Sequence, residues 1–165
     1  MKWVVERAFD RNDWFVLVAG LVLIGLAWLL PRRHSRQDVC LSMIFSVAAA
    51  SVLDNSFGYR TFDYYDIMDG PVASLMDYAA YVLYAPFGYF FLYFHSLLKV
   101  KGAANLIYVL LWSAAAVGFE WICHRFDVFH YKHGYRTLIS FAVYLYIQTI
   151  TLVFFKYVGA SEKIR

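Results

Sequence analysis

Long runs of residues without a charged side chain constrain this chain more than any other feature. A helix needs about 20 predominantly apolar residues to cross the hydrocarbon core of a bilayer, and runs near this length recur along the sequence. Candidate spans cover residues 14–30, 39–53, 78–98, 103–119 and 138–155. We therefore expect an all-α fold, a polytopic membrane helix bundle with about five transmembrane helices.

The composition favours the same class and argues against others. Of the 165 residues, 62% are apolar and 16% are charged, whereas soluble domains average roughly 45–50% and about 25%. The basic residues stand in short segments beside the apolar runs and form no continuous basic face, so nucleic acid is not an expected partner. We expect a single transmembrane domain over residues 1–165, with the lipid bilayer as its partner.

Two segments outside the spans have the character of interfacial elements. Residues 1–13 place apolar side chains at helical spacing with charges between them. Residues 54–71 mix acidic and aromatic side chains, and aromatic rings favour the headgroup region. The neighbouring run 39–53 would extend only about 22 Å as a helix at about 1.5 Å per residue, so a re-entrant hairpin remains an alternative to a full span there.

The distribution of Lys and Arg sets the expected orientation. The two sides of a five-span arrangement hold nearly equal numbers of basic residues, so the short segments beside the first span decide. Residues 31–36 contain Arg32, Arg33 and Arg36, whereas the basic residues before Trp14 are balanced by acidic ones. The N-terminus is expected outside and the C-terminus in the cytoplasm.

Ionisable side chains from several spans converge on one depth of the expected bundle. Asp54 closes the second span, Asp77 opens the third, Glu120 closes the fourth and Arg136 opens the fifth. A charge at the edge of a span is much less costly than one at the bilayer centre. Two interpretations therefore stay open, namely ion pairing of Glu120 or Asp77 with Arg136, and a functional pocket near the outer surface.

The candidate catalytic residues come from this layer. Glu120 and His124 are four residues apart and can share a helix face. In a catalytic site Glu120 would be the general base, His124 its partner, and Asp54 and Asp77 supporting carboxylates. The chain has no HExxH pattern, nucleophile elbow or phosphate-binding loop, so we predict no metal and no cofactor.

Polar and small residues also follow single faces of the expected spans. Tyr144, Gln148 and Thr151 share one face of the fifth span, which indicates either interhelical packing or a polar pathway. Ser42 and Ser46 belong to a small-residue stripe on the second span, typical of close helix packing. The same stripe is a candidate face for homo-oligomers or a membrane partner protein.

The C-terminal half also carries recognisable segments. These are PFGYFFLYF at 86–94, VLLWSAAAVGFEW at 109–121 and DVFHYKHGYRTLISFAVYLYIQTITLVFF at 127–155. They resemble an uncharacterised family of small multi-pass membrane proteins of bacilli and their relatives. The resemblance implies a bacterial cytoplasmic-membrane protein and again draws attention to Glu120, but it supplies no activity, ligand or partner.

The absence of catalytic motifs favours a non-enzymatic integral membrane protein, a structural or accessory component of the bacterial cytoplasmic membrane. One alternative is a membrane-embedded hydrolase or transferase with a polar site at the outer leaflet. Another is a small solute or ion carrier that uses Gln148 and Tyr144 inside the bundle.

Overall fold

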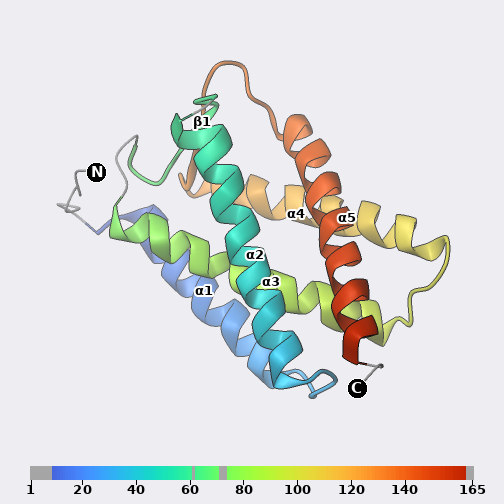
Figure 1. Ribbon diagram of the computed structural model, residues 1–165. Coiled ribbons are helices and arrows are strands. Elements are labelled where there is room, and N and C mark those ends of the chain that lie inside the picture. The colour runs from blue at the N-terminus through green and yellow to red at the C-terminus, as the bar shows by residue number, and fades with distance from the viewer. Residues whose placement is uncertain (1–8, 61, 71–73, 163–165) are drawn as a thin grey trace.

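The computed structural model describes residues 9–60, 62–70 and 74–162, and most of them are helical (Figure 1). The helices are α1 (Arg11–Leu29), α2 (Arg36–Asp54), α3 (Leu75–Leu97), α4 (Ala104–Arg125) and α5 (Thr137–Glu162). A π-helical turn, Asn55–Arg60, follows α2 directly, and two short strands, β1 (Tyr65–Ile67) and β2 (Phe129–Tyr131), lie in the connections. The expected all-α fold with five long helices is confirmed, and the short sheet is an addition to it.

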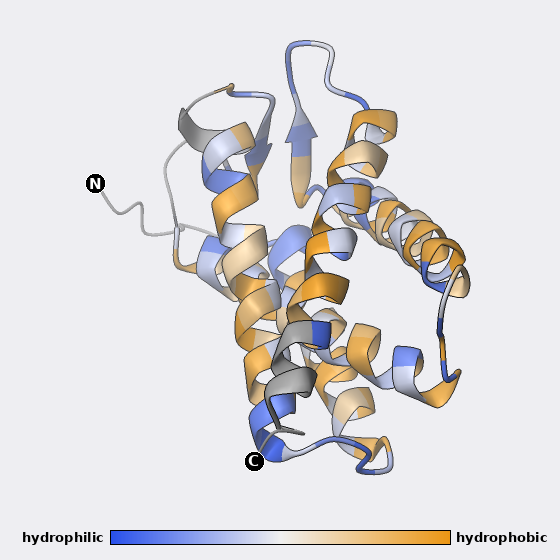
Figure 2. Ribbon diagram, turned by 45° about the vertical axis from the view of Figure 1, so that its right-hand side comes forward, coloured by the Kyte–Doolittle hydropathy of each residue, from blue (hydrophilic) through white to orange (hydrophobic). Residues whose placement is uncertain are grey.

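Four of these helices are long and apolar enough to cross a membrane. They are α1, α2 with its extension to Gly58, α4, and α5 as far as Lys156. The ribbon coloured by hydropathy shows that hydrophobic residues predominate along these helices (Figure 2). Large apolar side chains on them are exposed; Leu21 is 72% exposed and Trp28 is 87% exposed. Large apolar side chains exposed in such numbers fit a lipid environment and would be an aggregation hazard in water. The chain therefore has the character of an integral membrane protein.

The remaining long helix, α3, is the most interior one. It has 23 residues, which corresponds to a length of about 35 Å, but its several tyrosines reduce its mean hydropathy. It packs against α1 on one side and α2 on the other, and many of its side chains are buried, Leu83 and Phe91 among them. Because neighbouring helices rather than lipid surround these side chains, α3 tolerates a more polar sequence. A fifth span over α3 stays a prediction, as does the orientation.

Capping boxes fix the starts of the first three helices. In each, the N-cap side chain accepts a backbone hydrogen bond from within the first turn, and an Asp at the third helical position accepts one from the N-cap backbone. The pairs are Asp10 with Asp13, Ser35 with Asp38 and Ser74 with Asp77. Acidic residues at these positions also interact favourably with the positive end of the helix dipole.

A close approach of backbones holds α2 against α3. A Cβ atom added to Gly88 would lie 2.2 Å from the carbonyl oxygen of Ser42, so only glycine fits there without displacement of the helices. The Ser46 hydroxyl donates to the carbonyl oxygen of Tyr84 at 2.8 Å across the same contact. The small-residue stripe of the second helix is thus a packing face within the chain.

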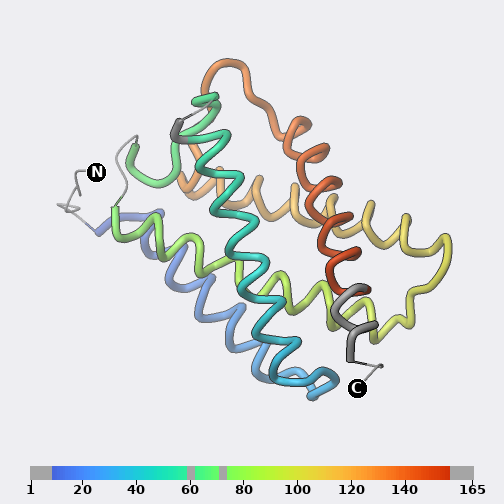
Figure 3. The backbone as a smooth tube through the Cα atoms, in the orientation of Figure 1, coloured from blue at the N-terminus to red at the C-terminus, as the bar shows by residue number. Residues whose placement is uncertain are grey.

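The helices form two groups. The first contains α1, α2 and α3, and the second is the pair α4 and α5; between the groups, α2 contacts α5 at few points. The backbone trace shows the paths of α3 and α4 and the short segment that joins them (Figure 3). Side chains link the two helices near that segment, where Tyr108 Oη donates to the carbonyl oxygen of Phe91 at 2.7 Å and His95 Nε2 lies 2.9 Å from Asn105 Oδ1. Elsewhere between the groups, side chains from α2, α3, α4 and α5 surround a cavity.

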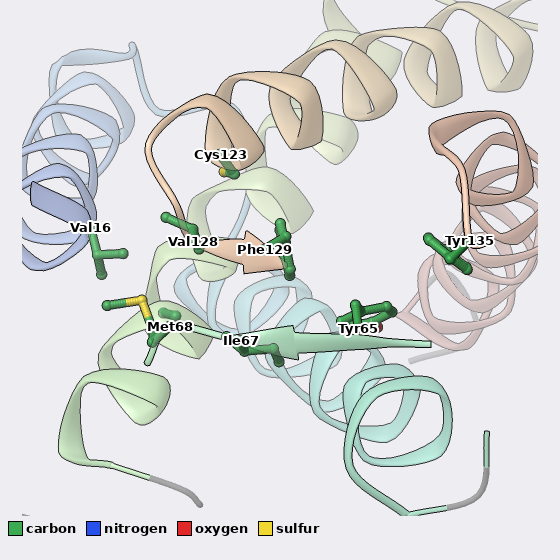
Figure 4. Close-up of a cluster of buried hydrophobic side chains, with 9 residues drawn as sticks. Val16, Tyr65, Ile67, Met68, Cys123, Val128, Phe129 and Tyr135 are labelled. Atoms are coloured by element: carbon green, nitrogen blue, oxygen red, sulfur yellow. The ribbon is translucent and has the colours of Figure 1, made fainter. Parts of the chain in front are cut away.

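A two-stranded antiparallel sheet ties the two groups together at one end, called here the sheet end. Strand β1 comes from the α2–α3 connection and β2 from the α4–α5 connection. Apolar side chains from the sheet pack into a buried cluster with Val16 of α1 and Cys123 of α4 (Figure 4). The strands are three residues each, so this cluster rather than the ladder supplies most of the stability of the junction.

The segments expected at the interface have a defined structure where they are described. Residues 54–71 contain the last residue of α2, the π-helical turn and β1, with residues 61 and 71 outside the described part. Of residues 1–13, only 9–13 are described, and there α1 begins at Arg11. The run 39–53 lies inside the longer helix α2, with no break into a re-entrant hairpin.

Candidate functional site

A cavity of about 200 Å³ lies between the two helix groups. Helices α2 and α3 line it on one side and α4 and α5 on the other, and almost half of the lining residues are aromatic. Both of its carboxylates and several of its hydroxyl groups lie toward the sheet end, namely those of Asp54, Tyr65, Glu120, Tyr131 and Ser140. A largely apolar cavity with a few convergent polar groups is the usual form of a small-molecule site.

Glu120 is the most heavily bonded group of this polar end. The side chain is 6% exposed, and its Oε1 accepts hydrogen bonds from Tyr131 Oη and Ser140 Oγ, both at 2.6 Å. Ser140 Oγ also lies 3.0 Å from Tyr135 Oη. Both hydroxyl donors bind the same oxygen, and the hydroxyl of Tyr144 on α5 also interacts with the Glu120 side chain.

Asp54 has an equivalent arrangement on the other side. It is the last residue of α2 and is 7% exposed. Its Oδ1 accepts a hydrogen bond from Tyr65 Oη at 2.7 Å. As with Glu120, the partner is a tyrosine on the short sheet.

The two carboxylate–tyrosine pairs are related by local two-fold pseudosymmetry. In each pair the tyrosine follows the carboxylate by 11 residues, and Tyr65 lies directly opposite Tyr131 in the antiparallel ladder. In both halves the carboxylate comes from the helix that enters the sheet end, α2 or α4, and the next helix leaves it. The same carboxylate–tyrosine arrangement therefore occurs twice at the polar end of the cavity.

Burial controls the protonation of these two tyrosines. It raises the pKa of Tyr65 far above its ordinary value, and the neighbouring Asp54 carboxylate raises it further. The pKa of Tyr131 is raised in the same direction, mainly by burial and then by its hydrogen bond to Glu120. Both phenols are thus protonated at physiological pH and act as hydrogen-bond donors to the carboxylates.

The other two candidate residues of the sequence analysis lie outside the cavity lining. His124 is exposed; its Nδ1 is 2.7 Å from the carbonyl oxygen of Phe129, and its ring stacks on Tyr131. Because a carbonyl oxygen only accepts, Nδ1 carries the proton. Asp77 is buried at the start of α3, where its Oδ2 accepts from the backbone N–H of Ser74 at 2.6 Å.

The structure thus brings Asp54 and Glu120 to one cavity and gives His124 and Asp77 other partners. Arg136 is exposed, and Glu120 accepts hydrogen bonds from hydroxyl groups in place of the ion pair with Arg136 that one interpretation of the sequence expected. The polar face of the fifth span does belong to the site, since Tyr144, Gln148 and Thr151 all line the cavity.

Sequence reasoning missed Tyr65, Tyr131 and Ser140. Each is an ordinary residue type in a connection or at the start of a helix; Tyr131 and Ser140 belong to the segments that carry the resemblance, which implies no role for them. The available signal was the repeated spacing, because an acidic residue precedes a tyrosine by 11 residues at both places. Once one pair is assigned, the second follows from the same spacing.

Within residues 9–60, 62–70 and 74–162, no group of three or more His, Cys, Asp or Glu side chains is arranged to hold a metal ion. The chemistry available at the cavity is hydrogen bonding and charge, from two carboxylates and several hydroxyl groups. Comparison of the chain with protein-family models, curated proteins and solved structures finds no match. The function has to be argued from the site itself.

Proposed function

We propose that this chain is an integral protein of the bacterial cytoplasmic membrane with an accessory, non-catalytic role, and that it acts by binding a ligand in the cavity between its helix groups. The observation that carries the proposal is the cavity itself. Protein interiors are normally close-packed, yet here about 200 Å³ stays open beside two buried carboxylates. An apolar cavity of about 150 Å³ already admits a benzene-sized molecule.

The hydrogen bonding around the carboxylates favours binding over catalysis. A general base of the kind expected for Glu120 works with a partner that orients it or relays its proton. His124, the expected partner, is bonded to Phe129 and does not line the cavity. Glu120 and Asp54 are instead held by protonated tyrosines, an arrangement that fixes the carboxylates in position.

Co-purification tests this proposal. The chain would be purified in detergent, denatured, and the released small molecules identified by mass spectrometry. Ala116 lines the cavity, whereas Ala114 on the same helix is exposed and does not line it. We expect one molecule, at near-stoichiometric amount, from the wild type and from Ala114→Phe, and its loss from Ala116→Phe. Equal recovery from all three proteins, or no molecule from the wild type, would contradict the proposal.

One contact favours a second candidate, a membrane-embedded hydrolase or transferase. Ser140 Oγ donates to Glu120 Oε1 at 2.6 Å, and a hydroxyl group hydrogen-bonded to a carboxylate is the basic form of an activated nucleophile. In this reading Ser140 would attack an ester or amide group of an envelope lipid. Incubation with radiolabelled membrane lipids tests it: turnover that disappears in Ser140→Ala would establish the enzyme and remove the accessory role.

A further inference from the structure

The charges around the cavity point to the class of its ligand. Among the residues whose side chains the structure describes, the lining includes the carboxylates of Asp54 and Glu120 and contains no Lys, Arg or His. The ammonium of Lys132, the residue that follows β2, is paired with Asp63 and Asp66, at 3.2 and 2.7 Å. Within this described part of the lining, the acidic end of the cavity has no counter-charge.

Buried carboxylates without a cationic partner are costly unless something compensates them. The hydrogen-bond donors that the protein supplies to the two carboxylates are neutral hydroxyl groups, which do not compensate the negative charge. A phosphate or carboxylate ligand would meet like charge at this end of the cavity. A cation placed near the two groups would be attracted by both, since Asp54 and Glu120 line the same cavity and interact electrostatically with each other.

The aromatic lining further limits the kind of cation that the cavity would bind. Phe57, Phe119 and Phe129 line the cavity together with the tyrosines of its polar end. Aromatic rings attract cations through their negative faces, and rings grouped as a cage are the usual recognition device for quaternary ammonium groups. A strongly hydrated inorganic cation would lose its water shell against such surfaces, whereas an alkylated ammonium group is weakly hydrated and apolar at its rim.

We propose that the ligand is an organic cation, an ammonium group on an apolar body, with the ammonium held between Asp54 and Glu120 and the body lying along the aromatic and aliphatic part of the cavity. This inference rests on the proposed function, because it assumes that the cavity is a binding site. The ammonium can belong to a free lipophilic amine or to the headgroup of a lipid, and the chemistry of recognition is the same for both.

Matched pairs of probes test the charge requirement. Benzyltrimethylammonium and neopentylbenzene have the same shape and differ in charge, and tetramethylammonium and neopentane form a smaller pair. Binding would be measured as the ligand-dependent rise of the unfolding midpoint, in a maltoside detergent that contains no ammonium group. We expect the charged member of at least one pair to bind roughly tenfold or more tightly than its neutral isostere. Equal affinity within each pair, or no binding of either cation, would overturn the inference.

Variants that remove one negative charge test whether Asp54 and Glu120 are the groups that bind the cation. Asp54→Asn and Glu120→Gln keep the shape of each side chain and remove its charge, and each is expected to weaken cation binding by about tenfold while neutral-isostere binding stays the same. Asp127→Asn is the matched control, because Asp127 is an exposed acid of the same end that does not line the cavity. Unchanged cation affinity in both cavity variants would refute the assignment. If neither variant folds, the wild-type comparison of charged and neutral probes still decides.

Two further experiments distinguish the source of the ammonium group and the charge class of the ligand. Competition by dodecylphosphocholine, but not by lysophosphatidylglycerol, would identify a lipid headgroup as the source of the ammonium group, and no competition by either would support a free cation. The co-purification experiment is independent of these probes. A co-purified neutral or anionic molecule would uphold the cavity as a binding site and refute only the cationic class.

Discussion

Tyr65 and Tyr131 lie directly opposite each other in a sheet of only two strands, and each donates a hydrogen bond to a carboxylate 11 residues earlier in the chain. The paired tyrosines therefore link the sheet to the ends of two different helices. They also connect the two helix groups, because β1 belongs to the α2–α3 connection and β2 to the α4–α5 connection.

Removal of either phenol should destabilise the bundle. In Tyr131→Phe, Glu120 loses a donor at 2.6 Å, and in Tyr65→Phe, Asp54 loses one at 2.7 Å. A hydrogen bond to a buried carboxylate of this kind contributes about 1–2 kcal/mol, so we expect similar losses for the two variants. Unfolding in mixed detergent micelles measures them. Tyr146→Phe, at a position that is 65% exposed, should change stability by less than about 0.5 kcal/mol.

The α2–α3 contact predicts contrasting effects of the same substitution at two glycines. In Gly88→Ala the new Cβ would lie 2.2 Å from the Ser42 oxygen and 2.8 Å from Ser46 Cβ, so the helices must separate, at a loss of about 1–3 kcal/mol. Gly118→Ala adds its Cβ where nothing lies within 4 Å and should be neutral or slightly stabilising. Comparable losses at both sites would contradict the close approach.

The connection between α1 and α2 predicts a pH dependence of stability. Burial lowers the pKa of His34 below its ordinary value, with an opposing contribution from Asp38. The folded state therefore favours the neutral ring. This contribution is complete above the unfolded pKa of about 6.5 and is lost as the pH falls from there toward the lower folded pKa. The unfolding midpoint should drop between about pH 7.5 and about pH 5.5, and His34→Gln should flatten this drop.

The orientation predicted from the basic residues can be tested by cysteine labelling. The background is Cys40→Ser, since Cys40 is exposed and Cys123 is 0% exposed. Asp127→Cys lies at the sheet end and Lys99→Cys in the α3–α4 connection. A membrane-impermeant maleimide should label Asp127→Cys in intact cells and Lys99→Cys only after permeabilisation. The reverse pattern would place the N-terminus in the cytoplasm.

The long helices were accessible from the sequence because their signal is local. The charge-free run 138–155 lies inside α5 and the run 14–30 inside α1 and its C-cap residue Leu30, and each needs only its own residues to be recognised. The capping boxes are an equally local signal. Asp77 belongs to one of them, because its carboxylate accepts a hydrogen bond from the backbone N–H of Ser74, and it does not line the cavity to which sequence reasoning assigned it.

The short sheet and the cavity depend on distant residues and were not visible. Strands of three residues carry almost no periodic signal, and Tyr65 meets Tyr131 only because the two helix groups come together. The partner of Glu120 illustrates the difference. The sequence predicted that Glu120 lies at the end of the fourth span, but the choice between Arg136 and a tyrosine hydroxyl as its partner depends on the tertiary structure.

An experimental structure in a lipid nanodisc tests the central claim most directly, because it shows what lies between the helix groups. We predict non-protein density in the cavity, within contact distance of Asp54 and Glu120, while Tyr65 and Tyr131 still donate to these carboxylates. A bundle in which α4 and α5 close against α2 and α3 and leave no space between Asp54 and Glu120 would contradict the account.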